Sequence, residues 1–514
     1  MRLQTDANNA SPIPADAPRG ENLARALWLY GNAPAVPLCN GLGRCGACRV
    51  RFSGSGPLPP PLDIEHEVLG AATDEGWRLA CRRTAAEAEG FALILPEIAP
   101  SPTPAARSED VGLIRRLAVD LGTSTIHWLG LDADGQIAAG GQAINPQAGA
   151  GADIISRLAA AASPHGRRRL SDMAQNLLRR IVAVTAPAGL EEICLAANTA
   201  MTAIFMDLPV DGLLAAPYRR PLEGSAAIRL PDLPPVWLPP QPAPFIGGDI
   251  AAGMGWALHE RPVPFPFLLA DLGTNGECVL ALDPDTALAA SAPLGPALEG
   301  MGLACGGAAG PGGVTAFALG PTGLTPRVSD GGAPRFLTGV GALALLDTLR
   351  RSGLLTAEGC PASPDLLPPL TRRLAKTVER TDTGWRLPLP GGLFLDAADV
   401  EAVLKVRAAF VLVVDSLLKR AGIRGADLGG VLLAGSLGEH APPDMLDRLG
   451  FLPPGALAGT KAVGNASLAG AALLLNRPDL RAPLARRCAA WDIVDVTADP
   501  DFLERFAGNM RLGA

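Results

Sequence analysis

The sequence predicts an α/β protein of several domains, and three observations carry that prediction. Two apolar stretches, 117–119 and 267–270, each run directly into the tetrapeptide Asp-Leu-Gly-Thr. A third apolar stretch, 431–434, runs into a glycine turn at Gly435. Short apolar runs that end at glycine are typical of buried strands that feed turns. Four of the nine cysteines lie within the first 81 residues, before all three strands, which predicts a separate small module.

Length and composition limit the protein's class. The 514 residues, 48% hydrophobic and 18% charged, are enough for about three globular domains. A net charge of −7 argues against a nucleic-acid-binding surface. A membrane span needs about 20 consecutive apolar residues, and the sequence has no run of that length. The first residues lack the apolar core of a signal peptide and the cysteine count is odd, so we expect reduced cysteines in the cytoplasm.

The N-terminal module has its own predicted elements. Residues 21–30 carry apolar positions at helical spacing and are followed by Gly31, which suits the end of a helix. A strand is predicted at 91–95. The sequence Pro-Ser-Pro-Thr-Pro follows, so we assign a stiff, extended linker to 98–112. The module therefore spans 1–97.

The cysteines of this module predict an inorganic centre. Three of them share one glycine-rich loop with the spacing Cys-x5-Cys-x2-Cys, and the four are Cys39, Cys45, Cys48 and Cys81. Glycines allow a loop to wrap a cluster and to direct backbone N–H groups at its sulfur atoms. Four thiolates also suit zinc, although zinc sites usually use two Cys-x2-Cys pairs, and free thiols are the third interpretation.

The cysteine pattern resembles that of the [2Fe–2S] ferredoxins, with a first gap like that of the adrenodoxin branch. The resemblance implies a β-grasp, ferredoxin-like domain over 1–97 and a [2Fe–2S] cluster bound by the four cysteines. Ferredoxin domains usually open with a β-hairpin before the helix. The first 20 residues here are short and irregular, so we expect a trimmed domain whose cluster is more exposed.

The two Asp-Leu-Gly-Thr turns predict phosphate binding. Glycine lets backbone N–H groups approach a phosphate closely, and the preceding carboxylate can orient a hydrated Mg²⁺. An ordinary β-turn is the alternative for either turn alone. The third turn suits packing against a flat nucleoside. The candidate catalytic residues are Asp120 and Asp271, and the candidate nucleotide-binding residues are Gly122, Thr123, Ser124, Gly273, Thr274, Asn275, Gly435 and Ser436.

The order of the three turns resembles the actin, sugar kinase and Hsp70 (ASKHA) superfamily of ATPases. The resemblance implies a duplicated, ribonuclease H-like core, in which the first two turns bracket the triphosphate of Mg-ATP and the third contacts adenosine. We expect one half over 113–265 and a C-terminal half over 266–514. Asp249 is either a carboxylate of the same site or the N-cap of a helix beginning at Ile250. We interpret 464–471 first as close helix packing and second as ligand contact.

A ferredoxin-like domain joined to such an ATPase resembles the reductive activators of corrinoid proteins. The resemblance covers nearly the whole chain past residue 20 and includes, besides the cysteine loop and the two turns, the segments 145–147, 151–157, 295–300 and 464–468. It implies a protein that uses ATP to pass one electron from its cluster to the Co(II) corrinoid of a partner, restoring Co(I). The sequence has no Asp-x-His-x-x-Gly motif, so the corrinoid belongs to the partner.

The expected partners are a corrinoid protein and an unidentified low-potential electron donor, with no nucleic acid and no membrane, and a homodimer is one candidate assembly. Two other functions stay open. A small-molecule kinase that uses the cluster as a redox sensor would need a base near the γ-phosphate, and no motif identifies one. An electron-transfer or docking module would use the nucleotide only to hold one conformation.

Overall fold

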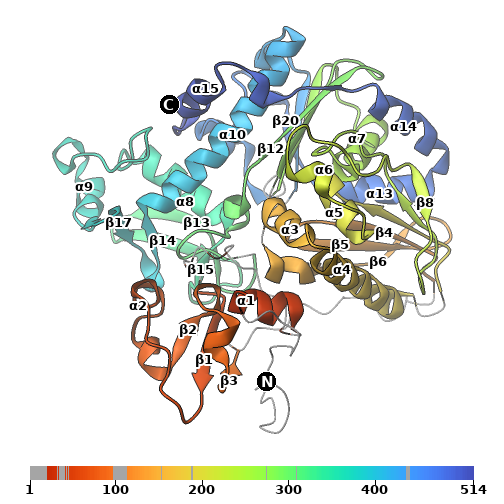
Figure 1. Ribbon diagram of the computed structural model, residues 1–514. Helices are drawn as coiled ribbons and strands as arrows, with labels where there is room; N and C mark the ends of the chain where they lie inside the picture. The colour runs from red at the N-terminus through yellow and green to blue at the C-terminus, as the bar shows by residue number, and fades with distance from the viewer. Residues whose placement is uncertain are drawn as a thin grey trace. The chain divides into compact units, whose positions relative to one another are not determined.

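The computed structural model describes residues 20–31, 33, 41, 43, 46–95, 113–151, 153–186, 189–273, 275–307, 309–435 and 440–513. The chain divides into two compact units, residues 1–239 and 240–514, and Figure 1 shows their elements. None of the helices in the described ranges has the length and hydropathy that a membrane crossing requires. The predicted linker at 98–112 and the shortened N-terminus at 1–19 lie outside the described residues.

The first unit begins with a small antiparallel sheet in the order β2-β1-β3. Its strands are β1 (Arg49–Ser53), β2 (Trp77–Leu79) and β3 (Ala92–Ile94), accompanied by helix α2 (Asp63–Leu69). Helix α1 (Leu23–Arg25) continues as a π-helical turn, Ala26–Tyr30, and buries its apolar side chains in the same small core as β1 and β2. The predicted helix at 21–30 and strand at 91–95 are confirmed. Gly31 differs from expectation, because its φ of −84° and ψ of −172° are extended and make no left-handed cap.

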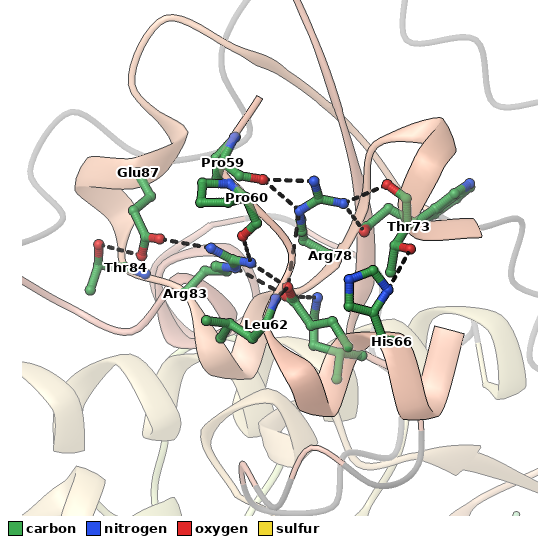
Figure 2. A network of polar contacts seen from close by, with 12 residues as sticks. Pro59, Pro60, Leu62, His66, Thr73, Arg78, Arg83, Thr84 and Glu87 are labelled. Atoms are coloured by element: carbon green, nitrogen blue, oxygen red, sulfur yellow. Dashed lines mark hydrogen bonds and ion pairs between the residues drawn. The ribbon is translucent and has the colours of Figure 1, made fainter. Parts of the chain in front are cut away.

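A buried ion-pair network ties this module together (Figure 2). The Glu65 side chain on α2 is fully buried and accepts hydrogen bonds from the backbone N–H groups of Leu62 (2.9 Å) and Leu79 (2.8 Å) and from Arg83 Nε (3.0 Å). Burial raises the pKa of Glu65, but these hydrogen bonds outweigh it and hold the pKa below its ordinary value. Figure 2 shows Arg78 and Arg83 directed at the carbonyl groups of Pro59 and Pro60. The network therefore fastens α2, β2 and the turn that carries Cys81.

The rest of the first unit is built on a six-stranded sheet in the order β6-β5-β4-β7-β9-β8. Strands β6, β5 and β4 are antiparallel, whereas β4, β7 and β9 are parallel. The elements are β4 (Arg116–Leu121), β5 (Thr125–Leu131), β6 (Ile137–Ile144), β7 (Glu192–Ala196), β8 (Ala226–Ile228), β9 (Val236–Leu238), α3 (Ile154–Ala161), α4 (Pro164–Thr185), α5 (Thr199–Phe205) and α6 (Asp211–Leu214). Helices α3, α4 and α5 pack against one another beside this sheet (Figure 1).

The second unit repeats this sheet. Its order is β20-β19-β10-β11-β12-β21, with β12, β11 and β10 antiparallel and β10, β19 and β20 parallel. Five strands therefore have the same order and directions as β6, β5, β4, β7 and β9 of the first unit, which confirms the predicted duplication. The strands are β10 (Phe267–Leu272), β11 (Asn275–Ala281), β12 (Ala287–Pro293), β19 (Gly430–Ala434), β20 (Thr460–Gly464) and β21 (Asp492–Ile493). Strands β10 and β19 are apolar at nearly every position because they form the central parallel pair of this mixed sheet and helices cover both of its faces.

The helices around this sheet pack closely. Helix α10 (Ala397–Ala421) contacts β11 and β12, while α7 (Gly248–Glu260) packs along α13 (Ala466–Asn476) on the other side of the sheet (Figure 1). A Cβ atom on Gly470 would lie 2.0 Å from the Ala252 carbonyl oxygen, so this contact requires glycine. The interpretation of 464–471 as a helix-packing segment is thus confirmed at Gly470.

Among its described residues, the unit also contains two three-stranded sheets and five further α-helices. They are β13 (Gly313–Gly320), β14 (Gly323–Val328), β15 (Phe336–Leu337), β16 (Glu379–Thr381), β17 (Gly384–Pro388), β18 (Phe394–Asp396), α8 (Gly339–Arg351), α9 (Pro369–Ala375), α12 (Pro443–Arg448), α14 (Arg481–Ala489) and α15 (Phe502–Asn509).

Candidate functional site

The first Asp-Leu-Gly-Thr turn joins β4 to β5. The Gly122 carbonyl accepts a hydrogen bond from Asn145 Nδ2 (2.8 Å), and a Cβ atom at Gly122 would lie 2.5 Å from the Thr125 carbonyl oxygen. The turn is therefore too tight for any residue but glycine. The Ser124 hydroxyl oxygen is buried and makes no hydrogen bond within the described part of the chain. Because buried hydroxyls in folded proteins are normally paired, this oxygen fits the role of a contact to a ligand.

The strand pairing of the first half sets a histidine against the candidate carboxylate. Asp120 on β4 is directly opposite His127 on β5, and His127 Nδ1 lies 3.8 Å from Asp120 Oδ2. A carboxylate beside an imidazole is electrostatically favourable when the imidazole is protonated.

The second half sets an acid at the equivalent position. Asp271 on β10 is directly opposite Glu277 on β11, and the Glu277 side chain is only 4% exposed. Burial raises the pKa of Glu277 well above its ordinary value, and the nearby carboxylates of Asp249 and Asp271 raise it further. The raised pKa favours the protonated form of Glu277, whose side chain is hydrogen-bonded to Asp249, while its Oε1 atom has no hydrogen-bond partner among the described residues. The second half thus holds three clustered carboxyl groups where the first half holds a carboxylate and an imidazole.

Of the two roles expected for Asp249, the structure excludes the helix N-cap. Helix α7 begins at Gly248 with Gly247 as its N-cap, so the N-cap interpretation of Asp249 is wrong. Asp249 lies in the first helical turn, where its Oδ1 accepts the Ile250 N–H (2.9 Å). The helix begins at Gly248, two residues earlier than the sequence suggested, and this leaves the Asp249 carboxylate beside Glu277.

The third glycine turn meets the second aspartate. Asp271 pairs with Ala434 across the parallel strands β10 and β19, so Gly435 follows directly beside it. Gly435 has a φ of +81°, and a Cβ atom there would lie 2.5 Å from Asp271 Oδ1. The structure therefore brings Gly435 to the turn that contains Gly273 and Asn275, which are linked by a Gly273 N–H to Asn275 carbonyl hydrogen bond of 3.2 Å. Two further predicted residues, Thr274 and Ser436, lie outside the described residues.

Two of the four predicted cysteine ligands are described, and they are neighbours. Cys48 immediately precedes β1, Cys81 follows β2, and these strands are antiparallel with Arg49 opposite Leu79. The Ala80 N–H donates to the Cys48 carbonyl (3.0 Å), which extends the pairing to the cysteines. Cys48 is buried and Cys81 half-buried, and two cysteines at the paired ends of neighbouring strands fit a thiolate-bound metal centre.

The other two predicted ligands, Cys39 and Cys45, lie outside the described residues. Within the ranges that the structure describes, no group of three or more His, Cys, Asp or Glu side chains is arranged to hold a metal ion.

Three functional candidates were absent from the predicted site. Asn145 and Asn198 contact the first turn, Asn198 through its Nδ2 at 3.4 Å from Thr123 Oγ1, and Glu277 faces the second turn. Both asparagines are also helix caps, accepting the backbone N–H groups of Gln147 (3.0 Å) and Met201 (2.9 Å). An asparagine at the end of a strand and the start of a helix was the available signal for these two residues. A carboxylate within an otherwise apolar strand was the signal for Glu277.

Comparison with known proteins gives two family matches in this chain. Residues 116–260 match the family described as the RACo middle region, and residues 266–514 match the C-terminal domain of RACo, the ASKHA domain. The corrinoid activation enzyme RamQ of Eubacterium limosum is 26% identical over 423 residues, which cover 77% of this chain and 70% of RamQ. The [Co(II) methylated amine-specific corrinoid protein] reductase of Methanosarcina barkeri is 26% identical over 228 residues, covering 40% of this chain and 38% of the reductase.

A solved structure has the same fold over nearly the full length. It is a reductive activator for corrinoid, iron–sulfur protein, with a TM-score of 0.68, 19% sequence identity and coverage of 96% of both chains. This chain therefore carries a middle region of the RACo type and a C-terminal ASKHA domain of the RACo type.

Proposed function

We propose that this protein is an ATP-dependent reductive activator, which passes one electron to the Co(II) corrinoid of a partner protein and returns it to Co(I). The observation that carries the proposal is the duplication: Asp120 and Asp271 occupy equivalent positions, each at the end of the central strand of its sheet and each before a glycine turn. Two relatives whose names specify corrinoid activation or corrinoid protein reduction support the choice of acceptor.

The nucleotide site is proposed to use both turns. Asp120 and Asp271 would act on Mg²⁺ through water, and Gly122, Thr123, Ser124, Gly273, Thr274 and Asn275 would contact the phosphates. The unpaired Ser124 hydroxyl supports this role, because a phosphate oxygen would satisfy it. Gly435 and Ser436 would lie against the adenosine. The raised pKa of Glu277 favours its neutral form, which would lower the negative charge of the three-carboxyl cluster.

The electron site is proposed to be a [2Fe–2S] cluster held by Cys39, Cys45, Cys48 and Cys81. Such a cluster would supply one electron at a time, received from a low-potential donor. The positions of Cys48 and Cys81 at the paired ends of β1 and β2 support this assignment. We also keep a cytoplasmic location and the homodimer as predictions.

ATP can promote this reaction only if its binding or its hydrolysis favours the state in which the corrinoid protein is docked and its cobalt is reducible. If ATP binds more tightly to the state in which the corrinoid protein is docked and its cobalt is reducible, it increases the population of that state. By the same thermodynamic linkage, the docked Co(II) protein must strengthen ATP binding by an equal factor.

The test measures Co(I) formation by visible spectroscopy, with and without ATP, after chemical reduction of the protein in the presence of a Co(II) corrinoid protein. Asp271→Ala should lower ATP hydrolysis by roughly 10²-fold or more, as loss of a transition-state electrostatic group does. Cys48→Ser should remove the visible cluster absorbance and leave ATP binding intact.

Two variants act as matched controls. Asp382→Ala and Cys360→Ser change exposed residues of the same types, and both should behave as the wild type. Equal Co(I) yields with and without ATP would contradict the proposed function. ATP-dependent phosphorylation of a small molecule that survives Cys48→Ser would indicate a kinase instead.

A further inference from the structure

The segment 21–31 is fastened at its N-terminal end to the turn that carries Cys81. The Leu23 N–H donates to the Arg83 carbonyl (2.8 Å), and Asn22 Nδ2 donates to the Cys81 carbonyl itself (2.8 Å). The Ala85 N–H donates back to the Glu21 carbonyl (2.9 Å). Movement of the N-terminal end of this segment would therefore move the backbone of Cys81.

The C-terminal end of the segment is held by one arginine of the middle region. Arg169 on α4 donates from Nε to the Leu29 carbonyl (3.0 Å) and from Nη2 to the carbonyls of Tyr30 (3.3 Å) and Gly31 (3.1 Å). The last carbonyls of a helix lack internal partners and carry partial negative charge. Because Gly31 is extended and makes no cap of its own, the Arg169 guanidinium provides the cap from another domain.

Between its two ends, the segment packs so closely against the middle region that position 149 has no space for a side chain. A Cβ atom at Gly149 would lie 2.1 Å from Trp28 Cβ and 3.0 Å from Trp28 Cα. The Trp28 side chain is fully buried, and the Tyr30 ring stacks on His165 with ring centres 5.6 Å apart. Glycine at 149 is therefore required for the segment to dock in this way.

Gly149 belongs to a short turn that contacts the first Asp-Leu-Gly-Thr turn, which is a candidate phosphate-binding site. It belongs to the 3₁₀ turn Pro146–Ala150, whose N-cap is Asn145. Asn145 donates from Nδ2 to the Gly122 carbonyl (2.8 Å) and from its backbone N–H to the Ser124 carbonyl (2.9 Å). A continuous series of hydrogen bonds and packing contacts thus runs from the Cys81 backbone, through the segment, to the Asp-Leu-Gly-Thr turn of the first half.

We propose that the segment 21–31 couples nucleotide binding at this turn to the position of the cysteine-bearing module, with Arg169 as the positioning residue. The inference rests on the proposed function, since it assumes that the turn binds ATP. Nucleotide contacts at Gly122 and Ser124 fix the Asn145 side chain, and Asn145 fixes the turn that supports Trp28. Coupling of this kind is reciprocal, so docking of the segment strengthens nucleotide binding by the same factor that nucleotide strengthens docking.

The experiment measures amide hydrogen exchange at 23–31 in the full-length protein, with and without a non-hydrolysable ATP analogue and Mg²⁺, and needs no corrinoid protein. In the wild type the nucleotide should slow exchange in this segment. Arg169→Ala should speed exchange at least tenfold and make it insensitive to the nucleotide, with the cluster absorbance unchanged. Arg169→Lys, which keeps the charge but loses the two-nitrogen geometry, should restore part of the nucleotide response.

Two further variants exclude a general folding defect. Arg168→Ala removes the adjacent arginine, which faces Asp207 and is 75% exposed, and should leave exchange at 23–31 unchanged. Gly149→Ala should release the segment from its other contact and reproduce the Arg169→Ala result. Wild-type exchange that ignores the nucleotide, or an Arg169→Ala variant that keeps the full response, would overturn the coupling. Failure of the proposed function would be seen in a different assay, as Co(I) formation that does not need ATP. The hydrogen-exchange measurement does not include the corrinoid protein.

Discussion

The buried Glu65 carboxylate gives the sharpest stability prediction. It accepts four hydrogen bonds, from the backbone N–H groups of Leu62 and Leu79 and from Nε and Nη2 of Arg83. Glu65→Gln keeps the shape but turns one accepting oxygen into an NH₂ group, so two of the four donors would face another donor. Loss of a hydrogen bond to a charged group costs about 1.5–3 kcal/mol, and breaking a buried ion pair costs about 3–5 kcal/mol. We therefore expect the module to lose about 3–5 kcal/mol of local unfolding free energy.

Hydrogen exchange of the β1 and β2 amides in the full-length chain measures this quantity, because it reports local opening without assuming two-state unfolding of the whole protein. At pH 7 the expected loss corresponds to exchange about 10²- to 10⁴-fold faster. Glu67→Gln is the matched control, since it makes the same change on the exposed face of the same helix and should alter exchange little.

The same variant has an expected pH dependence. The pKa of Glu65 is lowered in the folded module, so its ionised form contributes stability above its ordinary value of 4.5, and this contribution is lost as the pH falls through the lowered folded pKa. The difference in local unfolding free energy between wild type and Glu65→Gln should therefore be largest at neutral pH and should decrease under acid conditions. A gap below about 1 kcal/mol at pH 7, or one that widens in acid, would refute the reasoning, since exposed ion pairs already reach that value.

Two predictions concern the second unit. The pKa of Glu277 is raised in the folded protein, so its burial costs stability progressively as the pH rises above 4.5. Glu277→Gln mimics the protonated acid and should therefore raise the melting temperature at pH 8 and not at pH 4. The control variant, Glu260→Gln at an exposed position, should change the melting temperature at neither pH. A pH-independent effect of Glu277→Gln would indicate that the acid is ionised in the folded state. Gly470→Ala should destabilise the α7–α13 contact by about 1–3 kcal/mol in denaturant unfolding, because its Cβ would overlap the Ala252 carbonyl. Gly320→Ala, with open space around the new methyl group, is the control, and equal effects of the two would argue against tight packing.

The repeated turns made the duplicated sheet predictable, but not the residues that face the aspartates. Strand identity follows from local apolar runs, and both Asp-Leu-Gly-Thr segments did end central strands. The partner of each aspartate depends on register, and register depends on turn length: Leu121 pairs with Ile126, whereas Leu272 pairs with Gly276. This difference of one residue gives the first half a histidine and the second half a glutamate.

The N-terminal helix shows a second limit of local patterns. Its apolar spacing predicted the helix correctly, and glycine at 31 suggested a left-handed cap. The cap is instead a guanidinium from Arg169, far along the chain, which leaves Gly31 free to be extended. Neither residue carries a local signal for the other, so only the tertiary fold identifies the contact.

The contact between Trp28 and Gly149 has a consequence for how the family can diverge. A side chain at position 149 is incompatible with the docked segment, and without the segment nothing in that contact opposes an alanine or serine there. The requirement for glycine in this contact therefore comes from the segment 21–31. Relatives that lost the N-terminal module would be released from it, and a lineage that acquired the module by fusion would need the glycine first or gain it soon afterwards.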